Sequence, residues 1–140
     1  MENFDYSSNG YYFITICTAN KQKILCNIVG DDAHIVPTNY GIIAEKYIKS
    51  IQGIDKYVIM PNHIHLIIKN GNGTMRASSP TVSQKIKSFK IMVTKTIGKS
   101  IFQRSFHDHI IRGENDYLKI WNYIDTNPHK WAEDKYYTVS

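Results

Sequence analysis

Long apolar segments are missing from this chain of 140 residues, and cysteine is scarce. No N-terminal stretch joins a basic start to a long apolar run, and polar residues break every apolar segment well short of a membrane span. Cys17 and Cys26 form no C-x-x-C pair and have no histidine-rich surroundings. We therefore expect reduced thiols without a structural disulfide, in a cytoplasmic protein that has no membrane partner.

Acidic residues are absent from Lys56 to His107, although the whole chain has 12 of them and a net charge of +5. The cations in that interval are Lys56, Lys69, Arg76, Lys85, Lys87, Lys90, Lys95, Lys99 and Arg104. A polyanion is the natural partner of such a segment, but a basic face kept only for solubility explains the charge equally well. Charge alone leaves both interpretations open.

Periodicity along the chain predicts alternating strands and helices. The predicted strands are residues 11–18, 57–60, 63–69 and 103–112, and the predicted helices run from 38 until Gly53, over 81–97 and over 114–127. Residues 70–80 carry nearly every loop-forming residue type, which predicts a mobile surface loop.

This order of elements predicts one α+β domain over residues 1–140. It matches a ferredoxin-like split βαβ layout, with an antiparallel sheet, helices on one face and an added C-terminal helix. The hydrophobic content of 42% is enough for a core. We expect the other sheet face to remain open for a site or a partner.

Two histidines share one face of a predicted strand. Successive strand side chains point to opposite faces, so His63 and His65 project together. The apolar residues of the same strand, Ile64, Leu66 and Ile68, project to the other side. Neutral imidazoles on an open face can bind a divalent ion, although surface histidines at this spacing are also common and two ligands are too few for a tight site.

The last helix carries a second pair of candidates. At roughly 100° per residue, Tyr123 lies about 110° from the centre of the apolar stripe, and Asn127 follows one turn later on the same side. An amide oxygen beside the two histidines would complete a cation site, while Tyr123 could attack a phosphate. Considered alone, this helix favours the simpler interpretation, in which Tyr123 flanks the core and Asn127 caps the helix before Pro128.

Two longer segments carry a family resemblance. Residues 57–68, YVIMPNHIHLII, resemble the His-hydrophobe-His signature of the single-tyrosine HUH transposases, especially the REP-associated tyrosine transposases. Residues 103–112, QRSFHDHIIR, followed by 123–128, YIDTNP, and by Trp131, resemble the C-terminal signature of the same group. The two segments keep the order and separation found in that family.

The resemblance implies an enzyme that nicks and rejoins single-stranded DNA in transposition. It implies that His63, His65 and Asn127 ligate Mg²⁺ or Mn²⁺ and that the C-terminal helix carries the nucleophile, Tyr123. Attack by Tyr123 would leave a 5′-phosphotyrosine and a free 3′-hydroxyl, which another strand's 3′-hydroxyl can reverse.

The expected partner is single-stranded DNA that forms a hairpin. We expect it to lie over the open sheet face and the basic second helix, where its phosphates contact lysine and arginine side chains. The candidate DNA-binding residues are Lys85, Lys87, Lys90, Arg104 and Arg112. The sequence leaves three questions open. These are the target DNA sequence, whether the protein is a homodimer or a monomer, and whether Tyr123 acts with its own histidines or with those of a second subunit.

Two other functions remain as alternatives. The first is a non-catalytic binder of structured single-stranded nucleic acid, in which the histidines are surface residues. The second keeps the nicking chemistry but uses it in replication initiation or plasmid transfer. His107 and His109 also alternate like a ligand pair, but we assign their strand to the sheet and the substrate side.

Overall fold

A computed structural model describes residues 10–30, 34–70 and 81–127. The expected surface loop over 70–80 lies outside the described residues apart from Asn70, as do Pro128 and Trp131. Within the described ranges, no helix combines the length and the apolar character that crossing a bilayer demands.

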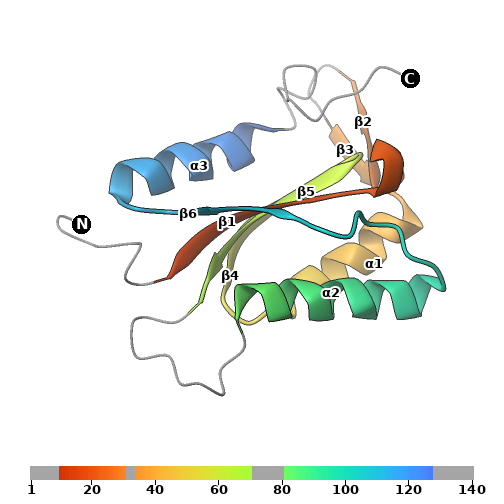
Figure 1. The fold of residues 1–140 in the computed structure, drawn as a ribbon. Helices are drawn as coiled ribbons and strands as arrows, with labels where there is room; N and C mark the ends of the chain where they lie inside the picture. Colours follow the sequence, from red (N-terminus) through yellow and green to blue (C-terminus); the bar gives the residue numbers. More distant parts are fainter. Residues whose placement is uncertain (1–9, 31–33, 71–80, 128–140) are drawn as a thin grey trace.

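Four antiparallel strands form the central sheet, in the spatial order β4, β5, β1, β6 (Figure 1). Their bounds are β1 Tyr11–Cys17, β4 Ile54–Met60, β5 His63–Lys69 and β6 His107–Ile110. Helix α1, Asn39–Ile48, connects β1 to β4, and helix α2, Val82–Ile97, connects β5 to β6. This is the split βαβ arrangement that the sequence predicts, so the α+β ferredoxin-like fold is confirmed.

Local signals in the sequence set the helix ends. The Thr38 hydroxyl accepts a hydrogen bond from the backbone amide of Gly41 at the start of α1. Thr81 and Gln84 form a capping box at the start of α2, which satisfies amide groups that have no partner inside the helix. Gly98 ends α2 in the left-handed conformation. Both boundaries of α2 agree with the prediction.

The main core lies between the sheet and the α1–α2 layer. Ile64, Leu66 and Ile68 of β5 are fully buried there, against α1 residues such as Ile48 and α2 residues such as Phe89. The alternation predicted for β5 is therefore confirmed, because the three apolar side chains share the face that the two helices cover.

The opposite sheet face is not left open. Helix α3, Glu114–Thr126, lies across it (Figure 1). Ile120 and Ile124 of α3 form a second, smaller core with Ile67 of β5 and Ile111. Because β5 ends its alternation with an apolar residue on the histidine face, part of that face must be covered, and α3 covers it.

Two further elements differ from the prediction. A separate two-stranded ribbon, β2 Cys26–Val29 with β3 His34–Pro37, follows a short 3₁₀ turn at Ala19–Lys21 and was not expected. Strand β6 has four residues, whereas the pattern predicted a strand over 103–112. The carbonyls of residues 103–105 accept hydrogen bonds from the Lys90 ammonium group, which removes them from the sheet ladder.

Two glycines with the same backbone conformation provide a matched stability test. Gly53 and Gly98 have φ of 90° and 93°, but a Cβ at Gly53 would lie 2.0 Å from the Lys69 carbonyl oxygen, whereas one at Gly98 would meet nothing within 4 Å. Gly98→Ala should lower the free energy of unfolding by about 1 kcal/mol, the cost of a positive φ. Gly53→Ala should cost about 1–3 kcal/mol more, because the backbone of β5 must move. Urea unfolding of both variants measures the difference, and equal losses would contradict the close approach.

Candidate active site

The two histidines lie on the α3 side of the sheet, at the end of β5 that follows the tight connection from β4. Both are buried, with exposed fractions of 0% for His63 and 1% for His65. Their rings contact edge to face, with centroids 4.5 Å apart. Cys17 pairs with His63 and Thr15 pairs with His65 across the β1–β5 ladder. The predicted sharing of one face by the histidines is therefore found in the structure.

Each imidazole has a polar neighbour at its Nδ1 atom. Asn62 Oδ1 accepts a hydrogen bond from His63 Nδ1 at 2.8 Å, which fixes the proton on Nδ1 and the lone pair on Nε2. The Thr15 hydroxyl lies 2.9 Å from His65 Nδ1 and is itself buried. A hydrogen bond at Nδ1 orients the ring and sets the tautomer, as partners of metal-binding histidines do.

Tyr123 reaches the histidines from α3. Its hydroxyl oxygen lies 3.4 Å from His65 Nε2, and the two ring centroids are 5.2 Å apart. Phe13 of β1 packs against both rings, edge to face with Tyr123. With 37% of its surface exposed, Tyr123 borders the solvent while its hydroxyl points to a buried imidazole. Tyr123 therefore lies between the solvent and the buried histidine pair.

Contacts between α3 and β4 fix the position of the helix on the sheet. The Lys56 ammonium lies 3.7 Å from the centroid of the Trp121 ring and 3.1 Å from an Asp125 carboxylate oxygen. The Tyr117 hydroxyl donates a hydrogen bond of 2.6 Å to Asp55. These contacts lie along the helix on both sides of Tyr123.

Asn127 lies at the C-terminal end of α3, one turn after Tyr123. Its side chain is 2% exposed, and its Oδ1 atom is buried without a hydrogen-bond partner. Such an atom is costly unless something binds it, and an amide oxygen is a normal ligand of Mg²⁺ and Mn²⁺. By their chemistry, two imidazole nitrogens and an amide oxygen are donors that suit a divalent ion. No three His, Cys, Asp or Glu residues gather into a ligand cluster in the described part of the chain.

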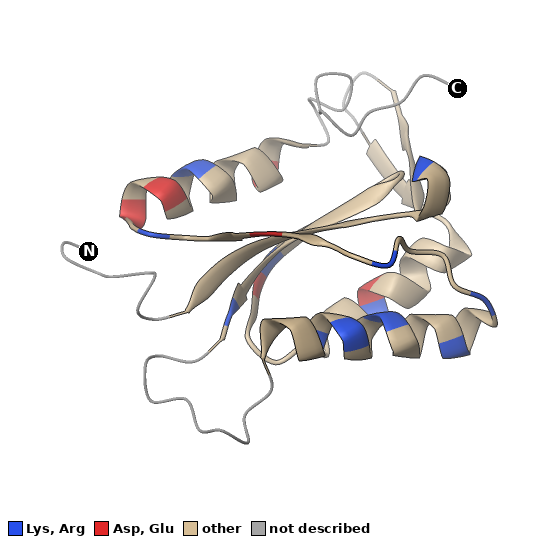
Figure 2. Ribbon diagram, in the orientation of Figure 1, with Lys and Arg blue, Asp and Glu red and all other residues tan. Residues whose placement is uncertain are grey.

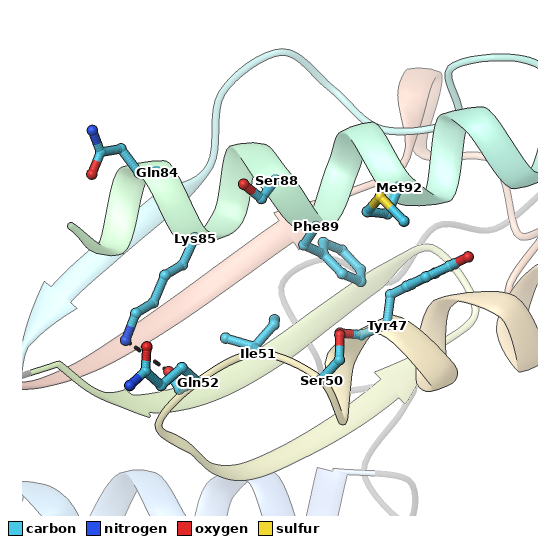
Figure 3. Close-up of a pocket in the computed structure, with 9 residues that line it drawn as sticks. All are labelled: Tyr47, Ser50, Ile51, Gln52, Gln84, Lys85, Ser88, Phe89 and Met92. Carbon is cyan, nitrogen blue, oxygen red and sulfur yellow. Dashed lines mark hydrogen bonds between the residues drawn. The ribbon is translucent and has the colours of Figure 1, made fainter. Parts of the chain in front are cut away.

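The predicted DNA-binding cations of α2 lie on the other side of the sheet from the histidines, whereas Arg112 directly precedes α3 and its amide donates to Asp116. Lysines are distributed along α2, which lies across the sheet from α3 (Figure 2). The Lys85 ammonium donates to the Gln52 carbonyl oxygen at 2.7 Å (Figure 3). Lys87, Arg104 and Arg112 are exposed. One DNA strand lying flat on the sheet therefore cannot contact both α2 and the histidines, so the path expected from the sequence, over an open sheet face and α2, does not fit this fold.

Burial shifts the pKa of several groups away from the histidines. Desolvation lowers the pKa of Lys85 and of Lys90, because burial disfavours their charged forms. Burial raises the pKa of the Cys26 thiol to about 12, so this thiol stays protonated at neutral pH. Cys17 and Cys26 form no disulfide, in agreement with the prediction.

Known proteins are similar to this chain in sequence and in fold. An uncharacterized protein of Haemophilus influenzae is 30% identical over 164 residues, covering 98% of this chain and 90% of its own length. A REP-associated tyrosine transposase of Escherichia coli K12 is 26% identical over 135 residues, covering 91% of this chain and 73% of its own. The solved structure of a REP-associated tyrosine transposase bound to a REP hairpin has a TM-score of 0.66 and 22% identity, covering 91% of this chain and 71% of that one.

The chain resembles the REP-associated tyrosine transposases in sequence over most of its length. No family model matches it. This similarity agrees with the resemblance of residues 57–68, 103–112 and 123–128 to that family, and the likeness to the solved transposase establishes the shared fold.

Two residues of this site, Thr15 and Asn62, were not predicted from the sequence. Thr15 lies 50 residues before His65, and no local pattern pairs them. Asn62 lies in the HIH-containing segment, in the gap between the predicted strands 57–60 and 63–69, where the pattern indicates only an interruption of the strand. The period-two rule would have found Thr15 only if the β1–β5 register had been known.

The Thr15 contact can be tested by stability. Thr15→Val keeps the shape of the side chain and leaves the buried His65 Nδ1 without its partner, which should cost about 1–3 kcal/mol in the free energy of unfolding. Thr126→Val is the matched control, because its hydroxyl binds the Asn122 carbonyl at an exposed position and should matter by less than about 0.5 kcal/mol. Chemical denaturation compares them, and an equal effect of both variants would disprove the Thr15 role.

Proposed function

We propose that this protein is a metal-dependent transposase that nicks and rejoins single-stranded DNA through a 5′-phosphotyrosine on Tyr123. The observation that carries the proposal is the approach of the Tyr123 hydroxyl to 3.4 Å from His65 Nε2, beside His63. A hydroxyl within reach of an oriented imidazole is an arrangement that suits nucleophilic attack. Sequence similarity to a REP-associated tyrosine transposase supports a DNA-processing activity of this kind.

His63, His65 and Asn127 would hold Mg²⁺ or Mn²⁺ in this proposal. Such an ion withdraws negative charge from a phosphate oxygen and so lowers the barrier to attack. The protein side chains supply the geometry: Asn62 and Thr15 hold the two rings, and the packing of Phe13 against Tyr123 limits where the phenol can move.

The chemical step transfers one phosphodiester bond. The Tyr123 oxygen attacks the phosphorus, the bond from phosphorus to the 3′ oxygen breaks, and the phenol proton passes to solvent while the leaving oxygen takes a proton. The 5′ phosphate stays on Tyr123 and the other fragment ends in a 3′-hydroxyl. Because the number of phosphoester bonds is unchanged, a 3′-hydroxyl can attack Tyr123 phosphate and rejoin DNA.

The geometry supports a site built within one chain. Tyr123 and His65 of the same molecule already lie together, and α3 is fixed by contacts from the same chain's β4. We therefore propose that Tyr123 acts with its own histidines. The proposed substrate is hairpin-forming single-stranded DNA, because the related transposase of known structure is bound to a REP hairpin.

Replacement of the nucleophile tests the covalent step. Tyr123→Phe should abolish the protein–DNA adduct, because no hydroxyl remains to attack, while DNA affinity changes by less than about twofold. Tyr47→Phe is the matched control, since it removes a phenol on α1 across the sheet and should form adduct at the normal rate. The adduct is measured by denaturing gel with a labelled hairpin oligonucleotide carrying single-stranded flanks. Adduct on Tyr123→Phe would refute the role of this residue.

Metal binding can be measured without catalysis. Added Mn²⁺ should raise the Tm of the wild-type protein, because a ligand that binds only the folded state stabilises it. Asn127→Leu should lose most of that rise, and Asn127→Asp, which keeps an oxygen, should retain it. Asn122→Leu, at an exposed position of the same helix, is the control.

Two results would contradict the metal assignment. One is a full Mn²⁺ response in Asn127→Leu, and the other is the absence of any response in the wild-type protein. Wild-type DNA binding that is indifferent to EDTA, with no adduct formed, would support a non-catalytic binder of structured single strands in place of the transposase.

A further inference from the structure

A basic groove lies beside α2, on the side of the sheet away from the histidines. It runs between α2 and the segment of residues 99–106, which passes back beside the helix toward β6 (Figure 1). Its volume is about 670 Å³. We call it the α2 groove. Its lining includes Lys87, Lys95, Arg104, Ile91 and Phe106.

Lys90 holds the far wall of the α2 groove. Its ammonium group donates to the carbonyl oxygens of Gln103, Arg104 and Ser105 at 2.8, 3.2 and 3.0 Å, so each of its three protons has a protein acceptor. It also lies 5.9 Å from the centroid of the Phe106 ring. Lys90 is therefore committed to ordering residues 103–106 and is poorly placed to contact a phosphate.

The charges that remain on the rim point to a polyanion. Lys87, Lys95 and Arg104 are exposed, and none of the described residues that line the groove is acidic. Three cations around one groove attract phosphates and release counterions when phosphates bind.

The floor of the groove distinguishes between kinds of nucleic acid. Ile91 is 44% exposed, and Phe106 is half-buried beside it. A duplex keeps its bases stacked inside and presents only phosphates and groove edges, so it leaves this apolar floor uncovered. A single strand presents base faces, which stack on aromatic side chains and cover apolar surface.

We propose that the α2 groove binds a single-stranded segment of the DNA substrate, with a base stacked on Phe106, phosphates at Lys87, Lys95 and Arg104, and Lys90 as a positioning residue. The inference rests on the proposed function and adds a second DNA site to it. Because α2 and α3 cover opposite sheet faces, DNA that reaches both sites passes around the β6 edge, where His107 and His109 are exposed. The bound segment is thus separate from the cleaved one.

Binding of two fluorescein-labelled oligonucleotides, measured by anisotropy, tests the groove. One is a hairpin with 12-nucleotide single-stranded extensions at both ends, and the other is the same hairpin without them. The wild-type protein should prefer the extended form. Phe106→Leu, which keeps apolar volume without the ring, should weaken binding of the extended hairpin about tenfold, and Phe106→Tyr should restore it. Equal affinity of the wild type for the two oligonucleotides would overturn the proposal.

The salt dependence separates Lys90 from the phosphate contacts. Arg104→Ala and Lys87→Ala should each reduce the slope of log K against log salt by about 0.7, the value for one phosphate contact with a single strand. Lys119→Ala on α3 removes the same charge outside the groove and should leave the slope unchanged. Lys90→Met should weaken binding with the slope intact, since its charge contacts protein carbonyls. A slope change in Lys90→Met equal to that in Lys87→Ala would refute its positioning role.

Failure of the groove and failure of the proposed function are distinguishable. Wild-type adduct formation on Tyr123, together with groove variants that bind the extended hairpin normally, would overturn only the groove. Should Phe106→Leu fail to fold, 2-aminopurine in the extension of the wild-type complex gives the same information, because stacking on Phe106 quenches its fluorescence. Unchanged fluorescence on saturation would exclude the stacked base.

Discussion

The alternation of side chains along β5 is the constraint on which the rest of the structure depends. This strand lies between β4 and β1, so each of its faces must be covered or used. Ile64, Leu66 and Ile68 enter the main core, and that choice sends His63 and His65 together to the opposite face. A shift of one residue in register would bury two imidazoles among aliphatic side chains and remove both from Tyr123. The same register of β5 is therefore required by the main core and by the histidine site.

The position of Tyr123 depends on a second, smaller core. Ile120 and Ile124 of α3 pack against Ile67 and Ile111, and each buried isoleucine contributes about 1.5–3 kcal/mol. The exposed contacts of Lys56 with α3 contribute less, about 0–1 kcal/mol for a surface ion pair, but they have direction. Apolar burial thus holds the helix on the sheet, and the polar contacts set its rotation, which decides where the phenol points.

The sequence predicted those features that depend on neighbouring residues. The alternation in β5, the capping residue Thr81 and the terminating Gly98 are local, and all three agree with the structure. Features that join distant segments were missed. Thr15 meets His65 only through the β1–β5 register, and Lys90 meets the carbonyls of residues 103–105 only after α2 and that segment pack together. The sequence therefore predicted Lys90 as a DNA-binding residue, whereas its ammonium group donates hydrogen bonds to protein carbonyls.

The separation of the two faces assigns different physical tasks to the basic residues and to the histidines. The α2 groove and the histidines lie on opposite faces of a sheet that is about 10 Å thick with its side chains, whereas exposed charges are screened over about 8 Å at physiological salt. Lys87 and Arg104 can therefore add little to stabilising a phosphate beside His65, and their effect is on affinity. The groups that act on the reacting phosphate in the proposed mechanism are those on the α3 face. Added salt should then slow the reaction by weakening DNA binding, while the chemical step of the bound complex is nearly insensitive to salt.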